Sequence, residues 1–388
     1  MLPAKILGGK NVMDFNLTEE QQLVQQTFAR FSDEQVRPVA AEIDEKGEYP
    51  RDLVSKLAEM GVFGLRYPES VGGSNVDFIS YCLVMEELAR GSLSLAACAA
   101  MQSLMGTHFL FALGTGDIHE RLLKPALRGE KIGTICITEP NAGSDLSAIS
   151  TAATKVEKGY VLNGQKMWIT AAPVADFFTV FARTGEEKRL TIFLVERDFE
   201  GLSVGQTIEK MGVWGSPTSE LSFADCFVPD DHRLGGEGDG EIQLRKILSE
   251  IRVMTGALAI GVARAALDDS VRYASERSQF GRPINRFQAI QIKLAEMQTD
   301  LSAATHMVRH AAWRLDSGQL TSQEAAMAKL FASERAVDIC DKATRIFASY
   351  GYAMEYPVQR YFRDIRFTLY GGGTSEILKL LIAREMTK

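Results

Sequence analysis

The chain has 388 residues, of which 46% are hydrophobic and 24% are charged, and its formal net charge is −7. This apolar content and low net charge exclude an intrinsically disordered chain. The length exceeds what one hydrophobic core usually covers, so we expect two or three domains. The mild acidity argues against nucleic acid as a partner, because proteins that bind it present a basic face.

Residues 17–130 are predicted to be helical. The segment Thr18-Glu-Glu-Gln21 predicts a capping box that opens a helix, and further helical spacing of apolar residues follows at 52–60 and 79–90. The longest apolar stretch, residues 92–105, contains Ser and Gln, so we interpret it as a buried helix and not as a membrane span. Residues 1–15 have no extended apolar region, so no secretory signal is expected.

From about residue 131 the pattern changes to short β-rich segments, which predict a small β-barrel or sandwich. They lie at residues 133–138, 159–162, 177–183, 190–195 and 220–228, with turns between them that include Asn163-Gly164. Helical periodicity returns over residues 241–275, 287–316, 321–351 and 373–386. The fold class expected is mainly α with a central β-domain, divided as residues 1–130, 131–240 and 241–388.

Cysteine and histidine spacing predicts neither disulfides nor a metal site. The five cysteines are dispersed without a CxxC pair, which is typical of reduced thiols in a cytoplasmic protein. His306 and His310 have helical spacing, but no third ligand is evident, so we expect no metal. The sequence also lacks GxGxxG after a strand, a P-loop and a GxSxG elbow, so these rules alone do not name a reaction.

Several segments taken in order nevertheless resemble the acyl-CoA dehydrogenase family of flavoproteins. They are Tyr67-Pro-Glu-Ser-Val-Gly-Gly, Ile137-Thr-Glu-Pro-Asn-Ala-Gly-Ser-Asp145, Asn163-Gly-Gln-Lys-Met-Trp-Ile-Thr170, Arg277-Ser-Gln-Phe-Gly281 with Phe287-Gln288, and Gly373-Thr-Ser-Glu376. The resemblance extends from about Met13 to the end of the chain. It implies a helical domain, a β-domain and a C-terminal helical bundle, usually assembled as a homotetramer, with FAD as cofactor and an electron-transfer flavoprotein as acceptor.

The resemblance also implies which residues bind FAD. Thr138, Ser144 and Thr170 are small hydroxyls suited to the polar edge of the flavin, and Trp168 offers an aromatic wall. Arg277 matches a residue that contacts the diphosphate from a neighbouring subunit. Arg345 with Ser349 replaces a family pattern of Gln followed by Gly-Gly, so a charge-assisted contact is expected there. The remaining predicted FAD residues are Ile135, Ile137, Gly143, Gln279, Phe280, Ile284, Phe287, Gln288, Ile346, Thr374 and Glu376.

The family reaction removes a proton α to a thioester, and the residue that would do so is missing. By the resemblance, a catalytic Glu is expected at the position of Gly372 or, in a minority of members, of Ile251. Glu250 lies one residue before the second position, which is a rotation of about 100° on a helix. We take Glu250 as the candidate relocated base, or else as a solvent-facing residue. Gly372 keeps the main-chain N–H that polarises the thioester, and Arg252 is expected near the substrate.

Three functions therefore remain open. The first is an FAD-dependent acyl-CoA dehydrogenase with a relocated base, acting on an acyl-CoA or other acyl-thioester. The second is different chemistry on the same scaffold, either desulfinase-like or flavin monooxygenase, in which Arg66 or Arg90 would bind an anionic substrate group. The third is action on acyl groups tethered to a carrier protein, with the basic stretch Arg360–Arg366 as a docking surface.

Overall fold

The computed structural model describes residues 16–387, and the secretory-signal expectation for residues 1–15 lies outside them. The first part of the chain is helical, as predicted. Thr18 caps the first helix, because its hydroxyl accepts from the Gln21 N–H at 3.2 Å while the Gln21 side chain accepts from the Thr18 N–H at 3.1 Å, so the predicted capping box is confirmed. The α-helices here are α1 (Glu19–Phe31), α2 (Ala40–Lys46), α3 (Arg51–Glu59), α4 (Phe78–Gly91), α5 (Leu93–Ala100), α6 (His108–Leu113), α7 (Gly116–Ile118) and α8 (Lys124–Leu127).

The apolar stretch predicted to be a buried helix is part of the core. In the described residues, Leu93–Leu113 is the one helical segment long and apolar enough to span a membrane, and 78% of its most apolar window is buried inside the protein. It comprises α5, a π-helical segment (Met101–Met105) and α6. The prediction of a core helix is confirmed.

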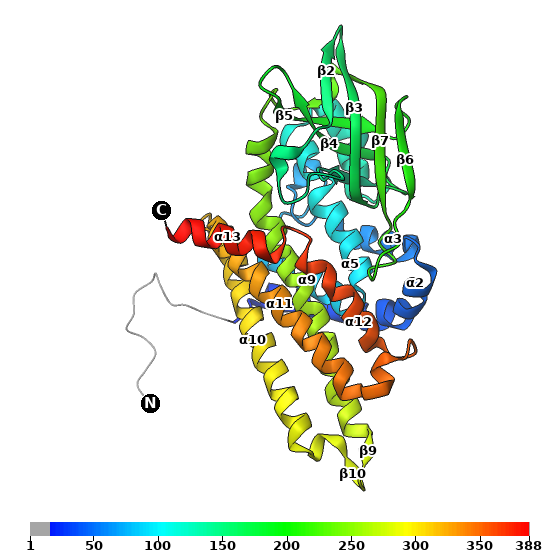
Figure 1. The fold of residues 1–388 in the computed structure, drawn as a ribbon, viewed down its shortest axis with the longest axis vertical. Coiled ribbons are helices and arrows are strands. Elements are labelled where there is room, and N and C mark those ends of the chain that lie inside the picture. Colours follow the sequence, from blue (N-terminus) through cyan, green and yellow to red (C-terminus); the bar gives the residue numbers. More distant parts are fainter. Residues whose placement is uncertain (1–15, 388) are drawn as a thin grey trace.

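The middle of the chain forms one eight-stranded sheet in the order β6-β7-β3-β2-β4-β5-β8, with β1 paired in parallel to β4 (Figure 1). Its strands are β1 (Gly133–Cys136), β2 (Ala152–Val156), β3 (Gly159–Thr170), β4 (Phe177–Thr184), β5 (Arg189–Glu196), β6 (Leu202–Thr207), β7 (Thr218–Pro229) and β8 (Arg233–Leu234). The predicted turn at Asn163-Gly164 is wrong, because both residues lie inside β3. Gly164 marks a register shift against β7, where an added Cβ would lie 2.6 Å from the Thr151 hydroxyl.

The last part of the chain is a helical bundle built on one long helix, α9 (Gly240–Glu276) (Figure 1). The other elements are the short strands β9 (Ser278–Gln279) and β10 (Arg282–Pro283) and the helices α10 (Gln288–Asp316), α11 (Ser322–Phe347), α12 (Pro357–Ile365) and α13 (Ser375–Met386). The predicted helix over residues 321–351 ends earlier, at Phe347. Ala348 has φ +54° and ψ −130°, which an α-helix does not accommodate.

Helix α9 joins the three parts of the fold. Its N-terminal end lies beside β5, and its middle packs against α4 of the N-terminal helical part and against α10 and α11. Gly261 permits the close approach to α4, because an added Cβ would lie 2.1 Å from the Glu86 carbonyl oxygen. Residues 250–252 therefore stand where the N-terminal helices meet the bundle.

Candidate functional site

The two positions at which the resemblance expects a catalytic Glu face each other across a short gap. A Cβ built on Gly372 would lie 3.6 Å from Cγ2 of Ile251 and 3.3 Å from the hydroxyl of Thr255. Gly372 has φ +72°, a conformation that favours glycine. A carboxylate from either position would thus enter the same small volume, and the chain has the hydrogen atom of Gly372 and the sec-butyl side chain of Ile251 there instead.

Glu250 points away from this volume, toward the N-terminal helices. Its carboxylate forms an ion pair with the guanidinium of Arg66, and the two side chains are only 18% and 13% exposed. Ile251 is buried in the core, as its place in the apolar stripe of α9 predicts. The role of Glu250 as the base stays a prediction, and the feature observed here is its ion pair with a nearly buried cation.

Arg66 stands in a box of aromatic rings. The guanidinium carbon lies 5.6 Å from the ring centroids of Phe78 and Tyr81 and 6.0 Å from that of Tyr67. Nη1 of Arg66 is buried, and within residues 16–387 it has no hydrogen-bond partner. His108 lies near this cation, and burial together with the charges of Arg66 and Lys246 lowers the pKa of His108 to about 4. His108 is therefore neutral at pH 7.

The glycine loop that carries Gly372 is held by a buried lysine. Nζ of Lys329 donates to the Gly373 carbonyl oxygen at 2.8 Å, and burial lowers the pKa of Lys329 to about 8. Arg252 is also buried and donates to the Ser322 hydroxyl at 3.1 Å, so it faces α11. Of the described residues, none accepts a hydrogen bond from the Gly372 N–H, which leaves that donor available. Thr374 caps α13 by accepting from the Ile377 N–H at 3.3 Å, and Glu376 is exposed in the first turn.

The predicted FAD residues of the β-domain lie together at the ends of β1 and β3. The Thr138 carbonyl accepts from the Met167 N–H at 2.8 Å, and the Thr134 hydroxyl donates to the Thr170 carbonyl at 2.7 Å. Trp168 lies in a β-bulge with φ +61°, and its side chain is 54% exposed. The structure places the other members of this set along β1 and the loop that follows it: Ile135, Ile137, Gly143 and Ser144.

These features fit a flavin. Strained backbone at Trp168 holds a flat aromatic surface open to solvent, and such strain is typical of ligand sites. Gly143 and Ser144 are exposed in the adjacent loop, and no atom lies within 4 Å of a Cβ built on Gly143. An isoalloxazine ring needs an aromatic surface beside it and hydrogen-bonding groups at its polar edge. Exposed Trp168 offers the surface, and the nearby hydroxyls and accessible main chain offer the hydrogen bonds.

An ion pair that the sequence analysis missed supports this loop. Glu139 accepts from the Ser150 and Thr151 N–H groups at 2.7 and 2.9 Å and from Nζ of Lys166 at 2.8 Å, and the Lys166 side chain is fully buried. Burial opposes ionisation of Glu139, but the hydrogen bonds from Lys166, Thr151 and Ser150 outweigh it and lower its pKa to about 2. Lys166, a lysine within the motif Asn163–Thr170, was the signal in the sequence that could have predicted this ion pair, because a lysine is buried only with a partner.

The remaining predicted FAD residues gather at the opposite end of the bundle, around the β9–β10 hairpin (Figure 1). The Arg277 guanidinium lies 5.3 Å from the Tyr350 ring, and Phe280 is 93% exposed. Exposed Arg345 pairs with Asp341 at 2.6 Å. The structure does not bring this set to the β-domain within one chain. The other members are Gln279, Ile284, Phe287, Gln288, Ile346 and Ser349.

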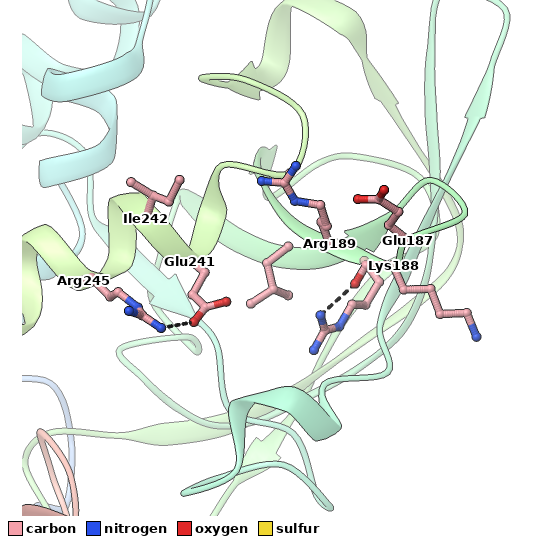
Figure 2. A pocket seen from close by; sticks show the side chains of 9 residues that line it. Glu187, Lys188, Arg189, Glu241, Ile242 and Arg245 are labelled. Carbon is pink, nitrogen blue, oxygen red and sulfur yellow. Dashed lines mark hydrogen bonds and ion pairs between the residues drawn. The ribbon is translucent and has the colours of Figure 1, made fainter. Parts of the chain in front are cut away.

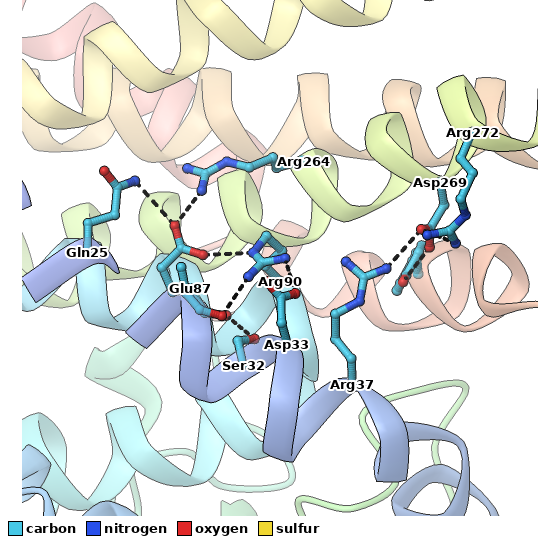
Figure 3. Close-up of polar contacts among 11 residues, drawn as sticks. Gln25, Ser32, Asp33, Arg37, Glu87, Arg90, Arg264, Asp269 and Arg272 are labelled. Carbon is cyan, nitrogen blue, oxygen red and sulfur yellow. Dashed lines mark hydrogen bonds and ion pairs between the residues drawn. The ribbon is translucent and has the colours of Figure 1, made fainter. Parts of the chain in front are cut away.

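Two other cations that the sequence suggested serve the packing of helices. Arg90 is fully engaged, since it donates to Glu87 and to Asp33, both at 2.7 Å, and to the Ala29 carbonyl at 3.0 Å (Figure 3). In the stretch Arg360–Arg366, Arg360 is buried and Arg363 is paired with Asp44, so this segment is part of the fold.

A basic cavity of about 430 Å³ opens at the N-terminal end of α9, next to the β4–β5 turn. Lys188, Arg189 and Arg245 line it, together with Glu187 and Glu241 (Figure 2). Arg183, which also lines the cavity, donates to the carbonyls of Leu146 and Ser147 and so connects it to the loop of Ser144. Along α9, Glu241 precedes Ile251 by ten residues, or about 15 Å.

Comparison with known proteins accounts for this arrangement. Family models described as the acyl-CoA dehydrogenase N-terminal, middle and C-terminal domains match residues 18–130, 134–226 and 238–387. Benzylmalonyl-CoA dehydrogenase of Aromatoleum aromaticum is 66% identical over 97% of this chain and 100% of its own length. The caffeyl-CoA reductase-Etf complex subunit CarC of Acetobacterium woodii is 38% identical over 96% of this chain and 99% of its own length.

Among solved structures, butyryl-CoA dehydrogenase from Megasphaera elsdenii matches with a TM-score of 0.93 at 37% identity, over 97% of this chain and 100% of that one. The predicted fold class, helical parts on either side of a central β-domain, is confirmed. The chain belongs to the acyl-CoA dehydrogenase family and is an FAD-dependent oxidoreductase that acts on acyl-CoA thioesters.

Proposed function

We propose that this protein oxidises a 2-carboxyacyl-CoA, a thioester of the benzylmalonyl type, and releases the 2-carboxylate as CO₂. The observation that carries the proposal is the empty base position, since Gly372 and Ile251 share one volume and neither supplies a carboxylate. The 66% identical relative, benzylmalonyl-CoA dehydrogenase, supports the substrate class.

The chemistry follows from what a base does in this reaction. Removing the α-proton of a thioester generates an enolate, and loss of CO₂ from a carboxylate on the same carbon generates the same enolate without a base. The C–CO₂ bond breaks, and its electron pair moves onto the thioester carbonyl. Bound FAD, held by the predicted residues that include Thr138, Trp168 and Thr170, would supply the two-electron oxidation that removes a hydride from the β-carbon. The α,β-unsaturated thioester and CO₂ would be the products. With benzylmalonyl-CoA the unsaturated product is cinnamoyl-CoA.

The chain's own residues position the thioester and hold its developing negative charge. The unoccupied Gly372 N–H is a donor for the carbonyl oxygen, and Lys329 fixes the loop through the Gly373 carbonyl. Ile251 and Thr255 line the α-carbon side. The basic cavity beside Lys188, Arg189 and Arg245 would take the phosphates of the CoA nucleotide, and the pantetheine arm would run along α9 toward Ile251.

We also propose that each flavin site is shared between two copies of the chain, as in a homotetramer. Arg277, Arg345 and Phe280 lie at the far end of the bundle from Trp168, so one chain does not assemble both halves of the site. The electron acceptor would be an electron-transfer flavoprotein, which the name of the relative CarC supports. The five free, buried cysteines suit a cytoplasmic protein.

Anaerobic mixing of the FAD-loaded protein with matched thioesters tests the function. Benzylmalonyl-CoA should bleach the flavin, and 3-phenylpropanoyl-CoA, which differs only by the missing carboxylate, should not. Bleaching by 3-phenylpropanoyl-CoA that Glu250→Gln abolishes would instead support the relocated base. Bleaching by neither thioester, together with substrate-dependent consumption of oxygen and NADPH in a separate aerobic assay, would indicate a monooxygenase. Activity only on carrier-protein thioesters would indicate the third alternative.

A further inference from the structure

We propose that Arg66 is the residue that recognises the second carboxylate of the substrate, with Glu250 as the positioning residue that holds it. This inference rests on the proposed function, because it specifies how a 2-carboxyacyl-CoA is distinguished from a plain acyl-CoA.

The first support is the state of the guanidinium. One of its nitrogens, Nη2, contacts Glu250, whereas Nη1 is buried and has no partner within residues 16–387. A buried donor without a partner costs stability and therefore needs an explanation, and a ligand oxygen is a sufficient one. Arg90, by comparison, has every nitrogen of its guanidinium bound to protein oxygens.

The second support is the place of the Arg66 side chain relative to α9 and the apolar segment Leu93–Leu113. Glu250 directly precedes Ile251 on α9, so its ion pair attaches Arg66 to the residue next to one that lines the empty base volume. From the other side, two of the rings that enclose Arg66 are hydrogen-bonded to the buried apolar segment Leu93–Leu113. Tyr81 hydrogen-bonds to the Ser103 hydroxyl at 2.9 Å, and Tyr67 to that of Thr107 at 2.7 Å.

The third support is the polarity around the cation. The aromatic walls limit competition from water, so a charge-assisted contact is worth more here than at the surface. His108 is uncharged at pH 7 and does not compete as a cation. Of the other buried cations near the glycine loop, Lys329 donates to the Gly373 carbonyl, and Arg252 donates from Nη1 to Ser322 while its Nε has no partner among the described residues.

Glu250 has two effects in this arrangement. It holds Nη2 of the guanidinium and leaves Nη1 for a ligand oxygen, and it places a second negative charge close to the substrate carboxylate. Two carboxylates at one guanidinium repel each other, and loss of CO₂ removes that repulsion. A plain acyl-CoA has no oxygen to offer Nη1, so it gains no affinity from this cation.

Binding of two dead-end ligands to the oxidised FAD enzyme tests the inference apart from turnover. Cinnamoyl-CoA and benzylidenemalonyl-CoA differ by the carboxylate, and the shift of the flavin absorption spectrum reports their dissociation constants. Arg66→Gln should weaken benzylidenemalonyl-CoA by about 10- to 100-fold, the loss expected for a charge-assisted contact, and leave cinnamoyl-CoA unchanged. Lys246→Gln is the matched control, because it removes a nearby surface cation, and it should alter both ligands equally.

Arg66→Gln leaves Glu250 without its cation, so the double variant Arg66→Gln/Glu250→Gln keeps the test valid if the single one does not fold. It removes both charges together, and it should also lose the preference for the carboxylate. If either folded variant binds the two ligands with wild-type preference, the inference is wrong. That result leaves the proposed function intact. The proposed function fails separately, if the wild-type enzyme does not oxidise and decarboxylate benzylmalonyl-CoA.

Discussion

Replacing Glu139 by Gln should destabilise the loop that carries the predicted flavin contacts. In the wild type, one carboxylate oxygen accepts from the N–H and the hydroxyl of Ser150, and the other accepts from the Thr151 N–H and Lys166. An amide has a single acceptor oxygen, so its NH₂ must face one of these donor pairs. Lys166, which is fully buried, also loses its counter-charge.

Breaking a buried ion pair by removing one partner costs about 3–5 kcal/mol, because the remaining charge stays buried. The pKa of Glu139 gives a similar magnitude: with about 2 in the fold against 4.5 in the free side chain, the ionised carboxylate contributes about 3 kcal/mol. Since the pKa is lowered, this contribution is complete above pH 4.5 and is lost as the pH falls toward 2. Between pH 7 and 5 the effect of the substitution should therefore be constant.

Urea denaturation at pH 7, followed by circular dichroism and by release of FAD, measures both consequences. Glu139→Gln should lower the denaturation midpoint and release FAD at lower urea than the wild type. Glu130→Gln is the matched control, because Glu130 pairs with Arg128 on the surface, and its midpoint should not change. A loss of less than about 1 kcal/mol for Glu139→Gln would refute the reasoning that this pair holds the loop.

Three further substitutions follow from the structure. Gly372→Glu should create activity on 3-phenylpropanoyl-CoA, measured as flavin bleaching. The substitution should lower the free energy of unfolding by about 1–2 kcal/mol, because φ is +72° at this position. If the variant binds this thioester and its flavin is never bleached, the assignment of the base position is wrong. In the wild type, the free energy of unfolding should fall by up to about 3 kcal/mol between pH 6.5 and 4, because His108 has a pKa of about 4 in the fold whereas the unfolded chain binds the proton below pH 6.5. His108→Gln should remove this loss. Urea titrations at both pH values measure it, and an unchanged pH dependence would contradict the lowered pKa of His108. Ala348→Gly should stabilise the protein by about 1 kcal/mol by relieving a backbone conformation of φ +54°, and a lower denaturation midpoint would show that the methyl group is needed for packing.

Local pattern predicts the fold well where one chemical rule decides the outcome. The capping box at Thr18 and the buried helix after Ser92 depend on neighbouring residues alone, and both are confirmed. Asn163-Gly164 has the composition of a hairpin turn, but pairing of β3 with β7 and β2 overrides it, and the glycine serves a register shift. Ala348 gives no local signal for the end of α11, because alanine is the best helix former.

In the candidate site, too, the local sequence predicts some residues, and others are brought in only by the tertiary fold. Motifs identified the residues that are predicted to contact ligand, because Thr138, Trp168 and Gly372 occur in segments with recognisable order. The groups that support them come from distant parts of the chain. Glu139 meets Lys166 through the approach of β3 to the segment after β1, and Arg66 meets Glu250 through the packing of the N-terminal helices on α9. A pairing of this kind depends on the tertiary fold, which spacing along the chain does not encode.

Counting CO₂ against reduced flavin tests the central claim most directly. Anaerobic single turnover of benzylmalonyl-CoA labelled in its free carboxylate should yield one labelled CO₂ for each flavin reduced, with cinnamoyl-CoA as the product. Reduced flavin without labelled CO₂, and benzylidenemalonyl-CoA as the product, would show that a base removes the α-proton after all and would contradict the account.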